Sequence, residues 1–133
     1  MILGIGIDSV ELARVMPWAQ GEPARLLRIF HADELEYCFK VPIKTAERLA
    51  ARFAAREACF KALAPHCAHQ LPFLTLCKMI RVSNLPSGAP ELIIDWSYLK
   101  TQGFFHPERP PKAHISLTHT DFQATAIVIL EHS

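Results

Sequence analysis

The segment from Thr45 to Leu63 contains neither proline nor glycine, although the 133-residue chain has 10 prolines and 5 glycines. It consists largely of alanine, arginine, leucine and other residues with high helix propensity. Thr45 can cap the start of a helix, Glu47 suits its first turn, and Pro65 is a stop signal. We therefore predict a long helix over residues 47–63, against which the rest of a chain this short must pack.

The start of the chain reads as an unusual strand. Residues 2–8 alternate between large and small side chains, as in a strand with two different faces. One face carries Leu3, Ile5 and Ile7, and the other carries Gly4, Gly6 and Asp8. Because glycine weakens a strand, two glycines on one face suggest that another backbone or a ligand packs very close to it.

The remaining elements follow from local signals. Before the long helix we predict helices over 10–16, ended by Pro17, and over 33–40, capped by Asp33. The later part of the chain is predominantly of β type. Its predicted elements are a hairpin of strands 74–82 and 91–96, a short helix over 97–102, and closing strands over 114–119 and 124–130.

Composition limits the class of protein. Hydrophobic residues make up 50% of the chain, enough for one core, so a single domain over residues 1–133 is expected. The formal charge of +1 indicates no bulk attraction to nucleic acid or to a membrane. The cysteines form no C-x-x-C pair, the start lacks the features of a signal peptide, and no apolar stretch approaches the roughly 20 residues of a membrane span. We expect a cytoplasmic location.

Two charged residues of the predicted helix stand out on a helical wheel. One side of the wheel is lined by Arg48, Arg52 and Arg56. Glu57 and Lys61 fall within the apolar arc opposite, where a desolvated charge is unfavourable unless a ligand compensates it. With Asp8 they could hold Mg²⁺ against a diphosphate, with waters and phosphate oxygens as the other ligands. An ordinary ion pair at a groove edge, worth about 0.3–0.5 kcal/mol, fits the wheel equally well.

The segment HISLTHT forms a second group. His114, Ser116 and Thr118 share one strand face, and His119 lies on the other. Such a row can bind a substrate, or it can serve only packing and local hydrogen bonds. The chain lacks a P-loop, a nucleophile elbow and an H-E-x-x-H motif, which argues against the enzymes that depend on them.

Three segments, GIGIDSVELARV, RFAAREACFKAL and HISLTHT, together closely resemble the holo-acyl-carrier-protein synthases, the small trimeric phosphopantetheinyl transferases. The resemblance implies an α+β fold, with an antiparallel strand meander packed on a long helix, and a homotrimer with active sites between subunits. It implies transfer of the 4'-phosphopantetheine group of coenzyme A to a serine of apo acyl carrier protein, in support of fatty acid biosynthesis. Adenosine 3',5'-bisphosphate is then the second product.

The same resemblance assigns roles to residues. Asp8 and Glu57 match Mg²⁺ ligands, and Lys61 matches the lysine that faces the pyrophosphate, so these three form the expected catalytic centre. Glu57 is also a candidate proton relay. His114 matches a position at the coenzyme A phosphates, and Ser116 and Thr118 lie beside it. We therefore expect Lys61 and these three residues to bind the co-substrate.

A basic patch is expected to meet the acidic carrier protein. Arg14 lies where the resemblance implies an arginine against the carrier, and Arg25 and Arg28 could extend that patch. A solvated surface without a partner is the simpler explanation for scattered arginines.

Two segments depart from the family pattern. Residues 64–68 read APHCA where a glycine-rich loop is usual, and residues 88–90 read GAP where Gly-Lys-Pro is common. Proline and β-carbons restrict the backbone near the cofactor, so a member that only binds carrier protein or nucleotide is an alternative. A different magnesium-dependent phosphoryl enzyme is another. His66, Cys67 and His69 form a conceivable soft-metal cluster, for which accidental clustering is the simpler explanation.

Overall fold

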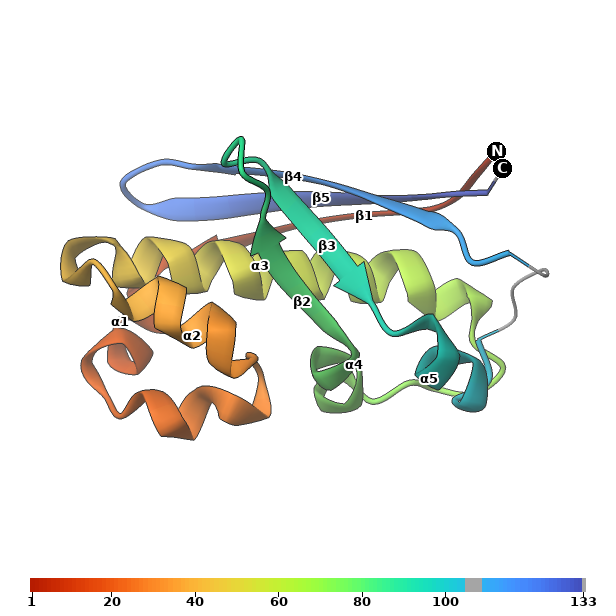
Figure 1. The fold of residues 1–133 in the computed structure, drawn as a ribbon, viewed down its shortest axis with the longest axis horizontal. Helices are drawn as coiled ribbons and strands as arrows, with labels where there is room; N and C mark the ends of the chain where they lie inside the picture. Colours follow the sequence, from red (N-terminus) through yellow and green to blue (C-terminus); the bar gives the residue numbers. More distant parts are fainter. Residues whose placement is uncertain (105–108, 133) are drawn as a thin grey trace.

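A three-stranded antiparallel sheet lies along one long helix (Figure 1). The strands follow the order β1 (Ile2–Glu11), β5 (Gln123–Glu131) and β4 (Lys112–His119), and the helix is α3 (Thr45–Leu63). This computed structural model describes residues 1–104 and 109–132. The two ends of the chain meet at one end of the sheet, where the His132 amide donates to the Met1 carbonyl oxygen at 2.7 Å.

The other elements surround α3. Figure 1 shows α1 and α2 near its N-terminal half, α4 and α5 near its C-terminal half, and the β2–β3 hairpin crossing it. Their bounds are Leu12–Gln20 (α1), Ala32–Phe39 (α2), Phe73–Met79 (α4), Trp96–Thr101 (α5), Ile80–Asn84 (β2) and Pro90–Ile94 (β3), with 3-10 turns at Pro23–Arg28 (η1), Pro42–Lys44 (η2) and Ala64–His66 (η3). Among the helices of the described residues, none combines the length and hydrophobicity of a membrane span.

The expected α+β class is confirmed, with antiparallel strands packed on a long helix. The helix α3 ends at Leu63, two residues before Pro65, as predicted. It begins at Thr45 itself, so the cap position falls on Lys44 and not on Thr45. The hairpin, α5 and the two closing strands also correspond to predicted elements.

The strand predicted over 74–82 is wrong over most of its length. The chain forms helix α4 up to Met79, and β2 begins only at Ile80. Leu76 and Met79 of α4 are both buried, and their spacing of three residues is helical. A nearly continuous apolar run hides this spacing from sequence reasoning.

The first two predicted helices differ from the structure at their ends. α1 continues through Pro17 to Gln20, because Trp18 packs edge to face on Phe30 and Phe53, with ring centroids 6.3 and 5.2 Å apart. This burial offsets the backbone hydrogen bond that proline cannot donate. α2 begins at Ala32, so Asp33 lies in its first turn and is not the cap.

The backbones of β1 and α3 approach closely at two glycines. A Cβ atom on Gly6 would overlap the carbonyl oxygen of Ala58, and one on Gly4 would overlap that of Ala62. The close neighbour predicted from the small strand face is therefore a helix backbone. The next residue on this face is Asp8, which the contact holds beside α3.

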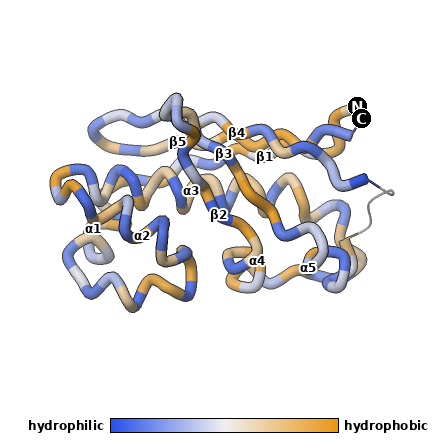
Figure 2. Tube along the Cα trace, in the orientation of Figure 1, coloured by the Kyte–Doolittle hydropathy of each residue, from blue (hydrophilic) through white to orange (hydrophobic). Residues whose placement is uncertain are grey.

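The opposite face of the sheet is exposed along β1, and it carries apolar side chains of β1 and β5. Ile5 and Ile7 are 56% and 57% exposed, and they lie directly opposite Ile129 and Ile127 of β5. Opposed residues of an antiparallel pair project to the same face, so the four isoleucines form one strip. Figure 2 shows the hydrophobic character of β1 along most of its length. We call this side of the sheet the outer face.

Candidate active site

Asp8, Glu57 and Lys61 come together where β1 packs on α3. Lys61 Nζ donates to Asp8 Oδ1 at 3.2 Å and to the carbonyl oxygen of Ile7 at 2.9 Å. Glu57 lies one turn before Lys61 on the same side of α3, and the charge of Asp8 acts on it. The structure thus brings together the three residues that the sequence singled out.

The pKa of Glu57 is raised above its ordinary value. Partial burial of the side chain is the main cause, and the negative charge of Asp8 adds to it. The positive charges of Arg14 and Lys61 act in the opposite direction. This carboxyl group therefore holds a proton more readily than a carboxyl group in water.

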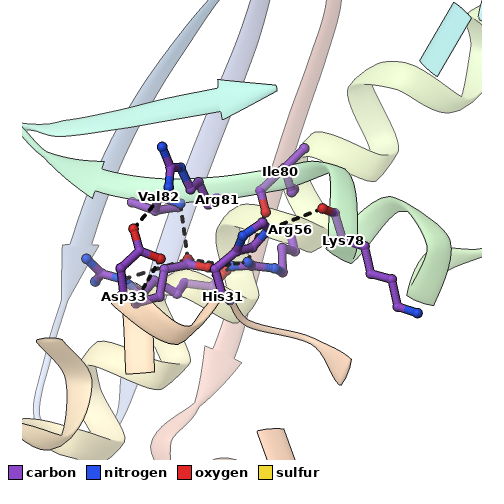
Figure 3. Close-up of polar contacts among 9 residues, drawn as sticks. His31, Asp33, Arg56, Lys78, Ile80, Arg81 and Val82 are labelled. Atoms are coloured by element: carbon purple, nitrogen blue, oxygen red, sulfur yellow. Dashed lines mark hydrogen bonds and ion pairs between the residues drawn. The ribbon is translucent and has the colours of Figure 1, made fainter. Parts of the chain in front are cut away.

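The buried charge of α3 lies at its arginines, and not at Glu57 and Lys61 as the helical wheel suggested. Arg52 and Arg56 are 4% and 0% exposed, whereas the Lys61 side chain is 53% exposed. Arg56 forms a two-pronged ion pair with Glu34 of α2, and it also donates to the Ile80 carbonyl oxygen of β2 at 3.0 Å (Figure 3). The wheel gives angles around the helix but cannot tell which side other elements will cover.

A groove that we did not predict lies on the arginine side of α3. It has a volume of about 250 Å³, and its lining includes Tyr37, Arg48, Arg52, Asn84, Pro90 and His119. Both guanidinium groups make cation–π contacts with the Tyr37 ring, with Arg48 at 4.0 Å and Arg52 at 4.4 Å from the ring centroid. The sequence signal was the spacing of the arginines, which by itself does not distinguish a groove from a solvated stripe.

His114, Ser116 and Thr118 share one strand face, which is the outer face. They lie opposite Ile129, Ile127 and Thr125 of β5. Asp8 lies opposite Ala126 instead, on the face that packs against α3. Within one chain the sheet therefore separates His114 and Ser116 from Asp8, Glu57 and Lys61, whereas Thr118, at the end of β4, also lines the groove beside Arg48 and Arg52. His114 Nε2 bonds Glu131 Oε2 at 2.8 Å, and this bond lowers the pKa of the Glu131 carboxyl group.

Known proteins resemble this chain in both sequence and fold. The sequence matches the 4'-phosphopantetheinyl transferase superfamily over residues 4–127. The chain belongs to this superfamily. The holo-[acyl-carrier-protein] synthase of Treponema denticola is 37% identical over 131 residues, covering 98% of this chain and 99% of that protein. That of Trichlorobacter lovleyi is 39% identical over 132 residues and covers 98% of each chain.

Solved structures show the same fold. A holo-(acyl-carrier-protein) synthase from Bacillus anthracis in complex with CoA (3',5'-ADP) matches with a TM-score of 0.73 and 30% identity, covering 100% of this chain and 99% of that one. The holo-[acyl-carrier-protein] synthase from Neisseria meningitidis matches with a TM-score of 0.75 and 28% identity, covering 99% and 100%. The 4'-phosphopantetheinyl transferase fold is therefore confirmed.

In this transferase the carboxylates of Asp8 and Glu57 fit Mg²⁺. Both are hard oxygen donors, and the effect of Asp8 on the Glu57 pKa shows that the two charges interact. A divalent cation between them would neutralise that repulsion. Within residues 1–104 and 109–132, no three His, Cys, Asp or Glu side chains gather into a metal site. One or two carboxylates completed by water and phosphate oxygens is the usual arrangement for Mg²⁺.

The three arginines expected to meet a carrier protein are all exposed in the transferase. Arg14 of α1 lies with its guanidinium 5.2 Å from the centre of the Phe53 ring, and its charge acts on Glu57. Arg25 and Arg28 lie in the turn η1, where Arg28 lines a separate depression of about 340 Å³ beside α4 and α5. Arg14 is thus the one that the structure relates to the Asp8, Glu57 and Lys61 centre.

The segment that departs from the transferase pattern is held by its own contacts. His66 Nε2 bonds the Leu3 carbonyl oxygen at 2.6 Å, and Cys67 Sγ donates to the Leu63 carbonyl oxygen at 3.6 Å. The His69 ring packs beside Gly103. These side chains have three different neighbours, which agrees with accidental clustering in the sequence.

Proposed function

We propose that this chain transfers the 4'-phosphopantetheine group of coenzyme A to a serine of apo acyl carrier protein, giving holo carrier protein and adenosine 3',5'-bisphosphate. Two relatives named for this activity match 98% of the chain. A third, from Bacillus anthracis, was solved with CoA (3',5'-ADP). The observation that carries the proposal is the meeting of Asp8, Glu57 and Lys61 at the contact of β1 with α3.

The three residues have the chemistry that the reaction needs. The carrier serine oxygen forms a bond to the β-phosphorus, the bond from that phosphorus to the adenosine bisphosphate oxygen breaks, and the serine proton passes to a base. The partly exposed Lys61 ammonium can turn to the phosphates and balance charge on the leaving group. Glu57 is the candidate to accept the proton. Mg²⁺ held by Asp8 and Glu57 would supply Lewis-acid stabilisation of the phosphate charge.

The groove beside Arg48 and Arg52 is proposed to bind a phosphate of the nucleotide. Two cations, Arg48 and Arg52, and one carboxylate, Glu47, line the groove, so positive charge is in excess in its wall. Arg52 Nε is buried without a hydrogen-bond partner among the described residues. An anionic ligand would compensate this excess charge, as a phosphate does when it meets paired arginines.

A homotrimer with shared active sites is part of the proposal. The groove lies across α3 from Lys61, and His114 lies across the sheet from Asp8. One coenzyme A molecule would contact Asp8 and Lys61 together with the groove and His114 most directly if these residues came from two different subunits. The exposed isoleucines of the outer face favour such an assembly, because large exposed apolar strips usually mark an interface.

The setting of the reaction is also proposed. Arg14, with Arg25 and Arg28, offers positive charge to an acidic carrier protein. The absence of a spanning helix among the described residues is compatible with a cytoplasmic enzyme that supports fatty acid biosynthesis. A binding-only member is the alternative, and the altered segment after α3 motivates it.

The test is the intact mass of an apo acyl carrier protein after incubation with this protein, coenzyme A and Mg²⁺. We expect a gain of one phosphopantetheine, abolished by a chelator. Transfer without coenzyme A would indicate a different phosphoryl enzyme. A folded protein that binds several carriers yet never changes their mass would support the binding-only alternative.

A further inference from the structure

The ion pair of Glu34 and Arg56 is buried more completely than any charge in the catalytic centre. Glu34 is 2% exposed and Arg56 is 0% exposed. Arg56 Nη1 donates to Glu34 Oε2 at 2.9 Å, and Nη2 donates to Oε1 of the same carboxylate. A planar guanidinium that meets a carboxylate with two parallel bonds fixes the angle between them as well as the distance.

Both partners also bind the β2–β3 hairpin. Figure 3 shows Arg56 beside Ile80 of that hairpin. Arg56 Nη2 donates to the Ile80 carbonyl oxygen at 3.0 Å, and the Val82 amide donates to Glu34 Oε2 at 3.1 Å. The other oxygen of the Glu34 carboxylate, Oε1, accepts a hydrogen bond from the His31 amide at 2.9 Å, at the start of α2. One carboxylate and one guanidinium therefore join α2, α3 and β2.

These three elements also supply most of the groove. Tyr37 comes from α2, Arg48 and Arg52 come from α3, and Asn84 and Pro90 come from the hairpin. Arg52 Nε lies 3.9 Å from Glu34 Oε2, so the buried carboxylate also attracts a guanidinium of the groove wall. The ion pair of Glu34 and Arg56 thus links the elements that line the groove.

We propose that Glu34 and Arg56 are positioning residues that set the distance between the hairpin and the arginines of the groove. The inference rests on the proposed function, in which that groove takes a phosphate of the nucleotide. A buried ion pair can often be replaced by apolar residues without loss of stability, so the contribution of this pair to stability is not a sufficient reason for its presence.

The placement of the groove predicts a specific kinetic signature. Glu57 and Lys61 lie on the opposite side of α3 from Arg48 and Arg52, so a looser hairpin weakens binding without moving the catalytic centre. We expect KM for coenzyme A to rise about tenfold or more, while kcat changes by less than about threefold. A general loss of structure would lower kcat by the same factor as the folded fraction and would leave KM unchanged.

The experiment compares two variants with a control. Arg56→Lys keeps the charge but loses the two parallel bonds, and Glu34→Leu combined with Arg56→Met removes both charges together. Arg81→Met serves as the control, because it breaks the exposed ion pair between Arg81 of the same hairpin and Asp33 of α2. Affinity for adenosine 3',5'-bisphosphate is measured by calorimetry, KM and kcat by carrier mass, and folding by thermal unfolding.

The outcomes distinguish the positioning role of Glu34 and Arg56 from the binding of the nucleotide in the groove. Weaker nucleotide binding in Arg56→Lys and in the double variant, with the control unchanged, supports the inference. Unchanged nucleotide affinity in a folded Arg56→Lys protein overturns it. Arg48→Ala tests the groove separately, because unchanged nucleotide affinity in that variant would contradict the binding of the nucleotide phosphate in the groove, whereas failure of the transfer reaction itself would show in the mass of the carrier.

Discussion

Lys61 of α3 bonds two successive residues of β1, the carboxylate of Asp8 at 3.2 Å and the carbonyl oxygen of Ile7 at 2.9 Å. The bonds form because Gly4 and Gly6 allow the helix backbone to touch the strand immediately before Asp8. The contact between the Lys61 ammonium and the Asp8 carboxylate is therefore a product of strand–helix packing. The proposed chemistry depends on this contact.

Replacing Glu57 with glutamine should remove transfer and keep the fold. The Glu57→Gln variant loses the charge but nearly preserves shape, and we expect kcat to fall by about 10²–10³-fold. Because burial and Asp8 raise the pKa of Glu57, the folded chain disfavours its charged form, so thermal stability at neutral pH should not fall. Carrier mass and thermal unfolding provide the two readouts. Full activity in this variant would contradict the assignment of Glu57.

Adding a methyl group to Gly6 should destabilise the protein. The new Cβ in Gly6→Ala would overlap the Ala58 carbonyl oxygen, which belongs to a rigid helix backbone, and we expect a loss of about 1–3 kcal/mol in the free energy of unfolding. Gly21→Ala is the matched control, since its nearest atom would lie 3.2 Å away. Urea unfolding of both variants measures the difference. Equal stability of the two variants would contradict a close contact between Gly6 of β1 and Ala58 of α3.

Charge on the outer face should disrupt the proposed homotrimer. We expect Ile7→Glu and Ile129→Glu to convert trimers into monomers, because burying an unpaired carboxylate at an interface is unfavourable. Ile43→Glu is the control, at a turn where the side chain is 90% exposed. Light scattering coupled to size-exclusion chromatography gives the mass of each. A trimer that tolerates both outer-face charges would place the interface elsewhere.

Removing Arg14 should weaken the use of carrier protein specifically. We expect Arg14→Ala to raise KM for the carrier about fivefold, which corresponds to ~1 kcal/mol for an exposed ion pair. KM for coenzyme A should stay unchanged, and the effect should diminish at high salt as the charges are screened. Lys100→Ala, an exposed cation on α5, is the control. An equal rise of KM for the carrier in the two variants would show that Arg14 makes no specific contact with the carrier protein.

The buried thiols should resist modification and link stability to alkaline pH. Burial raises the pKa of Cys59 to about 12 and those of Cys38 and Cys77 to about 11, from 9.0. A thiol-specific reagent should therefore label the half-buried Cys67 first in native protein. These raised values stabilise the fold fully below pH 9, and that stabilisation is lost as pH rises toward 11 to 12. Cys59→Ala should show a smaller alkaline loss in urea unfolding.

Much of the fold could be predicted because local signals agreed with the final packing. The stretch from Thr45 to Leu63 has helical propensity throughout, and the alternation in β1, β4 and β5 is that of strands. The signals failed at α4, where an apolar run suits either type of structure, and at Pro17, where the packing of Trp18 outweighs a lost hydrogen bond.

By itself the sequence determined the periodicity of the elements and the choice of Asp8, Glu57 and Lys61, because spacing along a chain fixes which residues share a face. Only the tertiary structure decided which faces are covered. It buried Arg56 against Glu34, opened a groove beside Arg52, and put His114 on the outer face away from Asp8. The physical reason is that burial depends on which distant elements pack together, and a helical wheel carries no information about partners far away in the chain.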